Sequence, residues 1–497
     1  MSENSTKGIW KVISASSMGT MIEWYDFYIF GSLAVVISTK FFPTDNPTAA
    51  FLSTLATFAA GFVVRPFGAL FFGRLGDIIG RKYTFMATLL LMGGSTFLIG
   101  CIPSYETIGF LAPLLVLILR LLQGLALGGE YGGAATYVAE HAPEGQKGYW
   151  TSWIQTTATV GLFISLMVIL ATKNILSAAD FDSWGWRVPF WVSIVMVGVS
   201  YLIRKNMDES PVFAKAKKEG TTSTNPLKES FGNRYNLKFV LLALFGATMG
   251  QGVVWYTGQF YAMSFMKTVM NIDSSQVDGL LGIALLIGTP FFIVFGWLSD
   301  KIGRKYIMMG GMLLAILFYR PIYKMMYNTT DLSHKTEIVA NTKETVAKTD
   351  NGGSITTIQK YYSDGTTALE KKTYVPKKET LSSISITINS GDEWTLIFLV
   401  FIQVLFVTMV YGPIAAFLVE MFPTKIRYTS MSLPYHVGNG IFGGLLPAIS
   451  TYFVIHAKES GKPDFYLDGL WYPIIIASVC FVIGMIYIDN KNKINHL

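Results

Sequence analysis

Long apolar stretches alternate with short polar connections along the whole chain. Twelve of these stretches reach about 18 residues or more, the length that a helix needs to cross a bilayer core, and charged residues, Gly/Pro clusters or polar loops bound each one. We therefore expect twelve membrane-spanning helices, over residues 12–39, 51–72, 83–102, 110–138, 149–172, 187–204, 239–266, 277–298, 306–326, 394–419, 430–455 and 471–489. Because the number of spans is even, both termini are expected on the same side of the membrane.

Two longer polar segments interrupt this alternation. Residues 205–238 separate six spans from six, which predicts an N-terminal six-helix bundle (1–204), a linker (205–238) and a C-terminal six-helix bundle (239–497). Residues 327–393 form an insertion between spans nine and ten. Within it, 355–362 and 366–375 flank an Asp-Gly pair and predict two strands of a hairpin. We expect a small β-rich cap outside the cytoplasm, with a disordered loop as the alternative.

The composition fits a membrane protein and excludes an ordinary soluble one. Hydrophobic residues make up 51% of the chain and charged residues 14%, about half the charged share that is usual in soluble domains. The net charge of +7 does not require a nucleic-acid partner, because Lys and Arg are concentrated in the connections on the side of the N-terminus. The positive-inside rule then predicts a multi-pass protein of the cytoplasmic (inner) membrane with both termini in the cytoplasm. Cys101 and Cys480 both lie in apolar stretches, which excludes a disulfide framework and a cysteine metal site.

The most specific motif is a ten-residue loop that occurs twice. Gly73–Lys82 follows span two, and Gly296–Lys305 follows span eight, 223 residues later. A weaker pair closes spans four and ten, where Glu140 and Glu420 each precede a proline by three residues. We therefore expect a duplicated six-span unit.

These repeated positions are candidates for a cytoplasmic gate. The aspartate of each loop can accept hydrogen bonds from amides at the N-terminus of a neighbouring helix, and the arginine four residues later can pair with a glutamate that ends another span. Such a charge cluster would hold one face closed and open it when the two halves rock; a role in membrane orientation alone is the alternative. The candidate gate residues are Asp77, Arg81, Glu140, Asp300, Arg304 and Glu420.

These motifs resemble the major facilitator superfamily, whose signature loop lies between spans two and three and again between spans eight and nine. The similarity narrows to the metabolite:proton symporter family through five further segments, at 19–27, 65–68, 120–133, 186–190 and 209–213. That family includes transporters of shikimate, alpha-ketoglutarate, citrate and proline/betaine. The resemblance implies an all-α membrane fold of two pseudo-symmetric six-helix bundles around a central site. The 327–393 insertion departs from the family pattern.

Charged residues inside predicted spans are costly and are therefore functional candidates. Asp26 and Glu23 lie three residues apart on one face of the first span, and Arg120, Gln123 and Glu130 lie close together on the fourth. If spans one and four line the cavity, as the resemblance implies, Asp26 can approach Arg120. Proton uptake by Asp26 and substrate contact would then compete for Arg120. The proton-coupling candidates are Asp26, Arg120, Glu23 and Glu130, and a purely structural ion pair is the alternative.

Two of the charges in the spans have a second interpretation. Glu130 lies in a glycine-rich stretch where helices can pack closely, so both a proton relay and a structural hydrogen bond fit it. Arg65 precedes Pro66 in span two and either attracts an anionic substrate or satisfies the neighbouring backbone.

Polar and aromatic residues in the spans supply the substrate-binding candidates. Those on span seven recur at intervals of four residues, which places them on one helix face, and such groups can orient a small polar solute at the midplane. Packing of the aromatic residues is the alternative. The candidates are Tyr25, Arg65, Gln123, Gln155, Gln251, Trp255, Tyr256, Gln259, His436 and Asn439.

The sequence contains no P-loop, Rossmann glycine pattern, zinc-binding His motif or nucleophile elbow. We therefore expect neither an enzyme nor an ATP-driven pump, and no cofactor or metal. The expected function is proton-coupled symport of a small polar metabolite, an organic acid or a zwitterionic osmolyte, by a monomer whose partners are the solute, protons and the lipid bilayer. A proton-independent exchanger or uniporter, and a transport-like sensor, are the alternatives.

Overall fold

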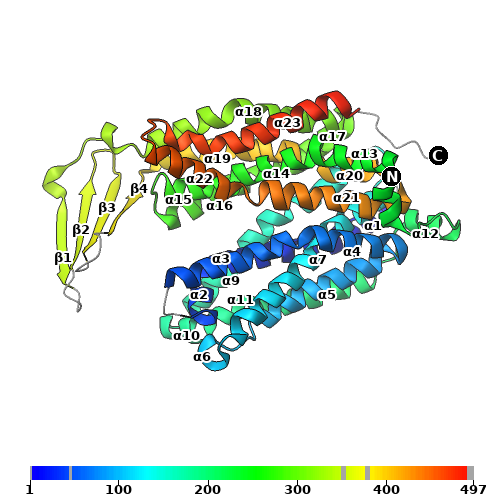
Figure 1. The fold of residues 1–497 in the computed structure, drawn as a ribbon, viewed down its shortest axis with the longest axis horizontal. Coiled ribbons are helices and arrows are strands. Elements are labelled where there is room, and N and C mark those ends of the chain that lie inside the picture. Colours follow the sequence, from blue (N-terminus) through cyan, green and yellow to red (C-terminus); the bar gives the residue numbers. More distant parts are fainter. Residues whose placement is uncertain (1–2, 44–46, 349–353, 375–380, 490–497) are drawn as a thin grey trace.

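Two bundles of helices lie side by side along the long axis of the molecule, and a β-sheet extends from one end (Figure 1). The computed structural model describes residues 3–43, 47–348, 354–374 and 381–489. Helix α1 (Glu3–Ser32) begins and helix α23 (Trp471–Tyr487) ends at the end of the bundles that lies opposite the strands. We call this end the termini side and the opposite end the insertion side.

The first half of the chain forms one bundle. Its further helices are α2 (Ala34–Phe41), α3 (Pro47–Val63), α4 (Arg65–Ile78), α5 (Arg81–Ile99), α6 (Tyr105–Ile108), α7 (Leu111–His141), α8 (Lys147–Gln155), α9 (Thr157–Ile175), α10 (Ala178–Ser183) and α11 (Val188–Lys205). The first span bends by 68° between α1 and α2. Gly31 and Ser32 precede the bend, and a Gly/Ser pair is one of the few common causes of a sharp kink.

The second half forms the other bundle, after the linker helix α12 (Pro211–Lys218). Its helices are α13 (Arg234–Ala243), α14 (Met249–Tyr256), α15 (Ala262–Thr268), α16 (Ser274–Gly288), α17 (Pro290–Ile302), α18 (Arg304–Thr329), α19 (Ser390–Tyr411), α20 (Ile414–Met421), α21 (Arg427–Val437), α22 (Leu446–Glu459) and α23. Span seven contains π-helical turns at Leu244–Thr248 and Thr257–Tyr261, and span eleven contains one at Gly438–Gly443. Such turns often occur at functional positions.

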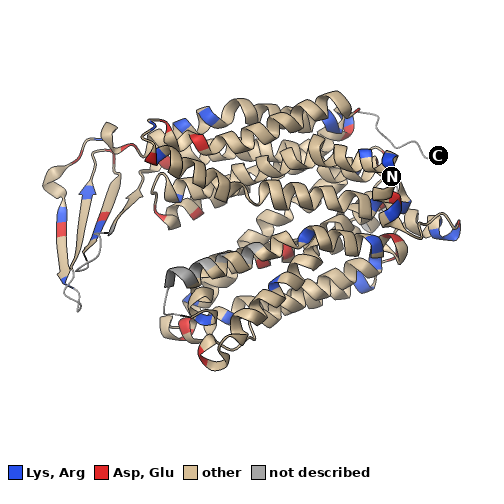
Figure 2. Cartoon of the chain, viewed as in Figure 1, with Lys and Arg blue, Asp and Glu red and all other residues tan. Residues whose placement is uncertain are grey.

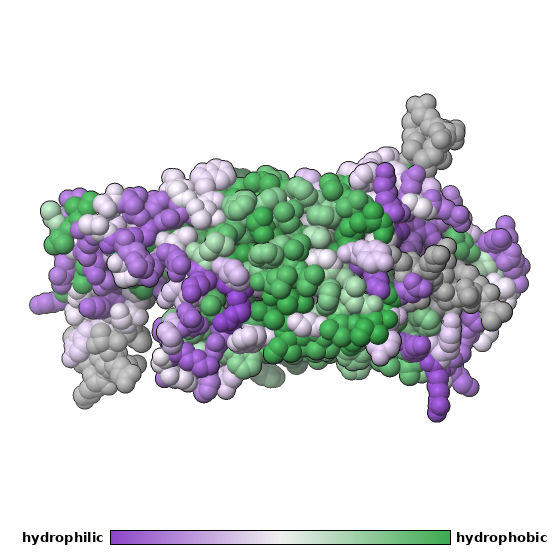
Figure 3. Space-filling view, turned by 90° about the horizontal axis from the view of Figure 1, so that it is seen from above, coloured by the Kyte–Doolittle hydropathy of each residue, from purple (hydrophilic) through white to green (hydrophobic). Residues whose placement is uncertain are grey.

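A broad apolar band crosses the face of the bundles that Figure 3 shows. Within the described residues, ten helices are long and apolar enough to cross a membrane, and the bent pair α1–α2 adds an eleventh. The predicted span over 51–72 is divided between α3 and α4, which have 17 and 14 residues and meet at Val64. Lys and Arg gather at the termini side and are sparse along the middle of the helices (Figure 2).

The insertion forms a four-stranded antiparallel sheet, in the order β1 (Lys343–Lys348), β2 (Ser354–Tyr361), β3 (Thr367–Tyr374) and β4 (Leu381–Thr387). The structure thus has strands β2 and β3 on the two flanks for which the sequence predicted a hairpin. Gly365 in the turn between them has a φ of 88°, which glycine adopts without steric cost.

Backbone and side-chain contacts fix this sheet to the second bundle. The N–H of Ile386 donates to the backbone oxygen of Asn271 at 2.8 Å, and the N–H of Asp273 donates to the oxygen of Ile386 at 2.9 Å. The Lys335 ammonium lies 2.6 Å from a carboxylate oxygen of Asp364 and 2.6 Å from one of Asp392, at the start of α19. The cap therefore moves with the second half of the chain.

Candidate functional site

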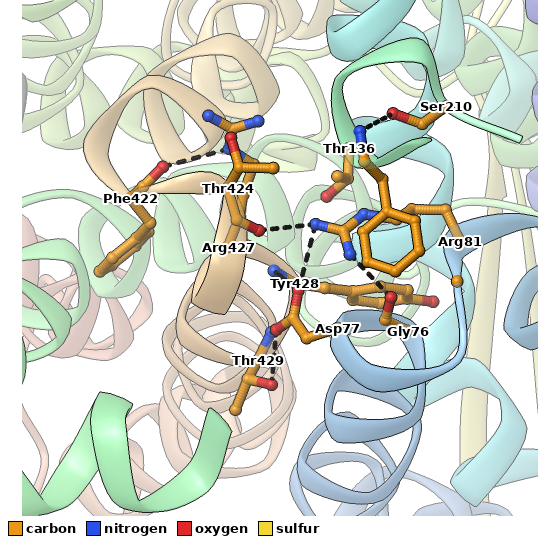
Figure 4. Close-up of polar contacts among 12 residues, drawn as sticks. Gly76, Asp77, Arg81, Thr136, Ser210, Phe422, Thr424, Arg427, Tyr428 and Thr429 are labelled. Carbon is orange, nitrogen blue, oxygen red and sulfur yellow. Dashed lines mark hydrogen bonds and ion pairs between the residues drawn. The ribbon is translucent and has the colours of Figure 1, made fainter. Parts of the chain in front are cut away.

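On the termini side, the first copy of the repeated loop joins the two bundles (Figure 4). Asp77, at the end of α4, accepts hydrogen bonds from the N–H of Thr429 at 2.9 Å and the N–H of Tyr428 at 3.3 Å, in the first turn of α21. Arg81 lies 3.2 Å from Asp77 and donates to the backbone oxygen of Thr424 at 2.8 Å. Asp77 therefore caps a helix of the opposite bundle, where the helix dipole favours a negative charge.

The second copy of the loop makes the reciprocal connection. Asp300, near the end of α17, accepts hydrogen bonds from the N–H of Gly148 at 2.8 Å and the N–H of Tyr149 at 2.7 Å, at the start of α8. Arg304 donates to Asp300 at 2.6 Å and to the two oxygens of Glu420 at 2.9 and 3.2 Å. Because each half caps a helix of the other, the bundles cannot separate on the termini side without breaking both sets of amide hydrogen bonds.

Glu140 lies at the centre of this closed end. It accepts a hydrogen bond from Arg427 of the opposite bundle at 2.7 Å, lies 3.6 Å from the Nε of Arg81, and accepts a hydrogen bond from the Ser210 hydroxyl. The structure thus has the contact with Arg81 that the sequence suggested and adds Arg427 as a closer partner.

The linker also takes part in the closed end, through Glu209 and Phe213 of the 209–213 segment, for which the sequence pattern predicts no specific role. Glu209 accepts hydrogen bonds from the backbone N–H groups of Arg81 at 3.1 Å and Lys82 at 3.3 Å, at the start of α5. Phe213 of α12 places its ring 4.4 Å from the Arg81 guanidinium. The linker therefore holds the repeated loop in place from the cytoplasmic surface that the sequence predicts.

A second linker contact reaches the loop before α21. Glu229 pairs with Lys425 at 2.9 Å and accepts a hydrogen bond from Ser223 at 2.5 Å. Burial alone would raise the pKa of Glu229, but the hydrogen bonds from Ser223 and Lys425 outweigh it and lower that pKa. The carboxylate therefore stays ionised at neutral pH.

A small cavity lies between the two bundles. The residues that line it are Thr20, Glu23, Trp24, Tyr131, Ile154, Gln155, Thr157, Tyr411 and Tyr435. Glu23 lies 3.5 Å from Arg65 of α4, and Gln155 donates to the Tyr131 hydroxyl at 2.8 Å. The Tyr131 ring stacks on that of Tyr435, with the ring centroids 3.7 Å apart. Glu23 and Gln155 are thus the sequence candidates that line this space.

Aromatic rings cover the cavity on the insertion side. The ring centroids of Trp24 and Trp255 are 4.9 Å apart, and those of Phe27 and Phe260 are 5.0 Å apart. Both contacts join the first span to the seventh, across the two bundles. The cavity is therefore enclosed by hydrogen-bonded helix ends on one side and by aromatic rings on the other.

Asp26 does not line the cavity but lies in a buried network inside the first bundle. One carboxylate oxygen accepts a hydrogen bond from Arg120 at 2.9 Å, and the other accepts from Gln123 at 2.9 Å and from the Thr96 hydroxyl at 3.0 Å. Arg120 also donates to Gln123 at 2.7 Å. The structure thus has the contact between Asp26 and Arg120 that the sequence predicts. Glu23, one turn earlier, instead lines the cavity and lies beside Arg65.

Glu130 is the centre of a separate buried ion pair. Arg204 of α11 donates to one of its oxygens at 2.6 Å, and the Thr88 hydroxyl donates to the other at 2.7 Å. Arg204 also donates to the backbone oxygens of Phe85 at 2.6 Å and Ala15 at 3.1 Å. Of the two interpretations from the sequence, these contacts favour the structural one, because the carboxylate joins α5, α7 and α11 and does not line the cavity.

Several other substrate candidates lie between spans seven and eleven. Gln251 and Asn439 bond to each other through both amide groups, at 2.9 and 3.1 Å. Trp255 and Tyr256 are buried beside the aromatic cover, and His436 is buried with its ring next to that of Tyr435. None of these five residues is among those that line the cavity, although Trp255 packs against Trp24 and His436 against Tyr435, which do line it.

Three substrate candidates have other partners or positions. The Tyr25 hydroxyl donates to the backbone oxygen of Pro189 at 2.6 Å, and Gln123 belongs to the Asp26 network. Successive residues of a helix point about 100° apart, so Tyr25 does not share the face of its neighbour Trp24. Gln259 lies in the π-helical turn Thr257–Tyr261, which disrupts the four-residue spacing predicted for this span.

Several residues that the structure brings to these sites are not among the candidates from the sequence, and Thr96, Arg204, Tyr131 and Tyr411 are examples. Thr96 carries no charge and gives no signal within an apolar span. Arg204 ends a span, where a cation usually sets the orientation in the membrane. Tyr131 and Tyr411 were overlooked because aromatic residues are common in spans, although a buried hydroxyl needs a hydrogen-bond partner and could have marked them.

Comparison with known proteins fits this geometry. Residues 11–233 match the family described as sugar (and other) transporter. The inner membrane metabolite transport protein YhjE of Escherichia coli strain K12 is 32% identical over 455 residues, which cover 89% of this chain and 87% of that protein. The chain belongs to the sugar (and other) transporter family of the major facilitator superfamily. This transporter is also similar to the alpha-ketoglutarate permease of the same strain, with 29% identity over 99% of this chain and 96% of the permease.

Two further similarities extend this result. The citrate-proton symporter of Salmonella typhi is 29% identical to the transporter, over 93% of this chain and 92% of that protein. The solved structure of the proton:xylose symporter XylE bound to 6-bromo-6-deoxy-D-glucose superimposes with a TM-score of 0.69 and 15% identity, and covers 98% of this chain and 97% of that one. The predicted major facilitator fold is therefore confirmed, and the chain is a multi-pass inner-membrane transporter and not an enzyme.

Proposed function

We propose that this transporter is a proton-coupled symporter that moves a small polar metabolite into the cell by alternating access. The observation that carries the proposal is the buried ion pair of Asp26 and Arg120, at 2.9 Å inside the first bundle. A charged pair at this depth is costly to maintain and is by default a functional element. The similarity to a citrate-proton symporter and an alpha-ketoglutarate permease supports transport of an organic acid, and a zwitterionic osmolyte is the second solute class.

In the proposed cycle, the proton acts on the Asp26 network. Arg120 and two neutral donors, Gln123 and Thr96, form hydrogen bonds to the two carboxylate oxygens of Asp26. A proton on Asp26 removes its attraction for the Arg120 guanidinium, which is then available to the rest of span four. Since α7 carries both Arg120 and the cavity residue Tyr131, this change can reach the solute through one helix.

Glu23 is proposed as a second titrating group, because its carboxylate lines the cavity. Arg65 is its partner at 3.5 Å, and a solute that binds beside Glu23 alters this contact directly. Glu130 has no such access, and we propose that it stabilises the bundle.

The gate is proposed to be the reciprocal pair of caps on the termini side. With the termini in the cytoplasm, as the charge distribution favours, the structure represents a state closed to the cytoplasm. Opening it requires Asp77 and Asp300 to release α21 and α8 together, because the two caps are related by the internal repeat.

Uptake into proteoliposomes under an imposed pH gradient tests the proposal. We expect radiolabelled citrate, 2-oxoglutarate, proline or glycine betaine to accumulate when the outside is acidic, and a protonophore to abolish the accumulation. Uptake that ignores the pH gradient and is stimulated by unlabelled solute inside would identify an exchanger. Binding without flux of any solute would identify a sensor.

A further inference from the structure

The side chain of Tyr428 extends from the second bundle into the first on the termini side. Its backbone N–H donates to Asp77, and the residue is fully buried. The phenol hydroxyl donates to the backbone oxygen of Gly129 of α7. A buried tyrosine hydroxyl usually has such a hydrogen-bond partner, and this partner belongs to the opposite bundle. The side chain therefore joins α21 to α7, in addition to the contact that the helix cap makes with α4.

Three glycines of the first bundle surround the ring, and we call them the glycine socket. They are Gly76 of α4 and Gly132 and Gly133 of α7. A methyl group on Gly76 would overlap the Tyr428 ring, which lies beside this glycine in Figure 4. A methyl group on Gly133 would lie 2.6 Å from the Tyr428 hydroxyl oxygen, and one on Gly132 would lie 3.0 Å from a ring carbon. Non-bonded carbon atoms pack at about 3.5–4.0 Å, so the ring fits here because these positions carry no side chain.

The two glycine pairs of α7 have different neighbours. A methyl group on Gly128 would overlap the backbone of α4 in the same bundle, which is the close helix packing that small residues allow in membranes. Gly132 and Gly133, one turn later, contact the ring from the opposite bundle. A methyl group on Gly133 would also lie 3.0 Å from Phe85 of α5. The three nearest atoms to a methyl group on Gly76 all belong to Tyr428, so Gly76 reports on the socket alone.

The internal repeat does not duplicate this arrangement. Asp77 accepts hydrogen bonds from Tyr428 and the residue after it, and Asp300 accepts them from Gly148 and the residue after it, so the repeat aligns Tyr428 with Gly148. A methyl group on Gly148 would overlap the backbone oxygen of Gly296, because α8 and α17 contact each other directly. Capping a helix therefore does not require a tyrosine at this position.

We infer that Tyr428 is a positioning residue for the transport cycle, which fixes the closed state of the termini side by placing its ring in the glycine socket. The ring leaves the socket when this side opens, since packed interfaces switch between discrete arrangements. A side chain in the socket therefore disfavours the closed state and leaves the packing within each bundle unchanged. The inference adds a residue to the proposed gate and rests on the proposed function only for alternating access.

Distances between spin labels on the two bundles test the inference in the purified full-length transporter in nanodiscs. Tyr83→Cys on α5 and Tyr306→Cys on α18 carry the labels, because both tyrosines are exposed near the termini-side ends of their helices. We expect Gly76→Ala to lower the ratio of closed to open molecules by about tenfold, as overpacking of a tight contact does. Tyr428→Phe, which keeps the ring and loses the hydroxyl, should lower this ratio by about threefold.

Control variants separate the socket from helix packing. Gly94→Ala on α5 should keep the wild-type distances, because its methyl group would meet no heavy atom of the described residues within 4 Å. Gly128→Ala should lower the temperature of thermal unfolding more than Gly76→Ala does. With the ring removed, the alanine fits, so Gly76→Ala/Tyr428→Ala should have the same distances as Tyr428→Ala. Wild-type distances in Gly76→Ala, or a further shift in the double variant, would overturn the inference.

The distance measurement needs neither a solute nor a proton gradient, which separates this inference from the proposed function. Variants that keep the wild-type distances, in a protein whose solute uptake is coupled to protons, would retain the symport and overturn the role of Tyr428. The predicted shifts in a protein that moves no protons would retain that role and overturn the symport.

Discussion

Removing the Glu130 charge should destabilise the transporter without abolishing its mechanism. In Glu130→Gln the Thr88 hydroxyl keeps a partner, but Arg204 becomes a buried cation without its counter-charge at 2.6 Å. Breaking a buried pair in this way costs about 3–5 kcal/mol. Arg204 keeps its hydrogen bonds to two backbone oxygens, so we expect the lower end, about 3 kcal/mol, which is on the order of a hundredfold in the unfolding equilibrium.

A denaturant titration of the purified protein in mixed micelles measures this loss as a change in the free energy of unfolding. The double variant Glu130→Gln/Arg204→Met removes the stranded cation and should recover about 2 kcal/mol of it, which is the coupling expected of residues in direct contact. Glu106→Gln, at an exposed position, should change stability by no more than about 0.5 kcal/mol. Wild-type stability of Glu130→Gln would refute the reasoning. A double variant that folds normally yet moves no protons would show that Glu130 is a relay.

Three further outcomes follow from other contacts. Asp300→Asn should weaken the cap on α8 and raise the hydrogen-exchange rates of the Gly148 and Tyr149 amides severalfold, because both amides donate to Asp300, and unchanged rates would contradict the gate. Burial alone would raise the pKa of Asp364, but hydrogen bonds from Lys335 and Thr366 lower it to about 2. The stability that ionised Asp364 contributes is therefore complete above its unfolded pKa of about 3.9 and is lost as the pH falls toward 2. The protection of β3 amides against hydrogen exchange, relative to their intrinsic exchange rate, should fall only below about pH 4. A loss of protection between pH 7 and 5 would contradict this. Replacing 331–390 by a short Gly-Ser linker should leave transport intact, and loss of solute affinity in a variant that inserts normally would assign the cap a role in binding.

The contacts of the closed end could be predicted from the sequence because the motif that makes them is short and occurs twice. The loop repeats with its charges at fixed spacing, and an aspartate beside a tight glycine turn has few possible partners other than a helix N-terminus. Gly80 and Gly303 indeed have φ values of 138° and 103° at the starts of α5 and α18. Arg427 could not be predicted, because it lies on no repeated motif and reaches Glu140 only through the packing of the two halves.

The surroundings of the two carboxylates on the first span could not be predicted from the sequence in this way. The three-residue spacing of Glu23 and Asp26 predicts that they share one helix face, yet their side chains enter different environments. Thr96 and Gln123 bind Asp26, whereas Arg65 and the cavity receive Glu23. Helical periodicity gives the direction of each side chain but not what lies in that direction. Whether a side chain meets a cavity or a neighbouring span depends on how the spans pack.

The bends and π-helical turns were also beyond the sequence pattern. The 51–72 segment reads as one apolar run, but the chain breaks at Val64 before Arg65 and Pro66. In span seven the residue spacing of an ideal helix predicts one face for Gln251, Trp255 and Gln259, and the turn at Thr257–Tyr261 disrupts it. Such turns depend on tertiary contacts more than on local propensity.

Proton movement coupled to solute is the central claim, and a pH-sensitive dye inside proteoliposomes measures it directly. Dicarboxylates, shikimate-like acids, proline and glycine betaine are added one at a time, with wild-type protein beside Asp26→Asn. We expect one solute class to acidify the interior with wild-type protein and to have no effect with Asp26→Asn that binds the solute normally. Wild-type protein that binds a solute but moves no protons, or an Asp26→Asn variant that acidifies the interior as fast as wild type, would contradict the account.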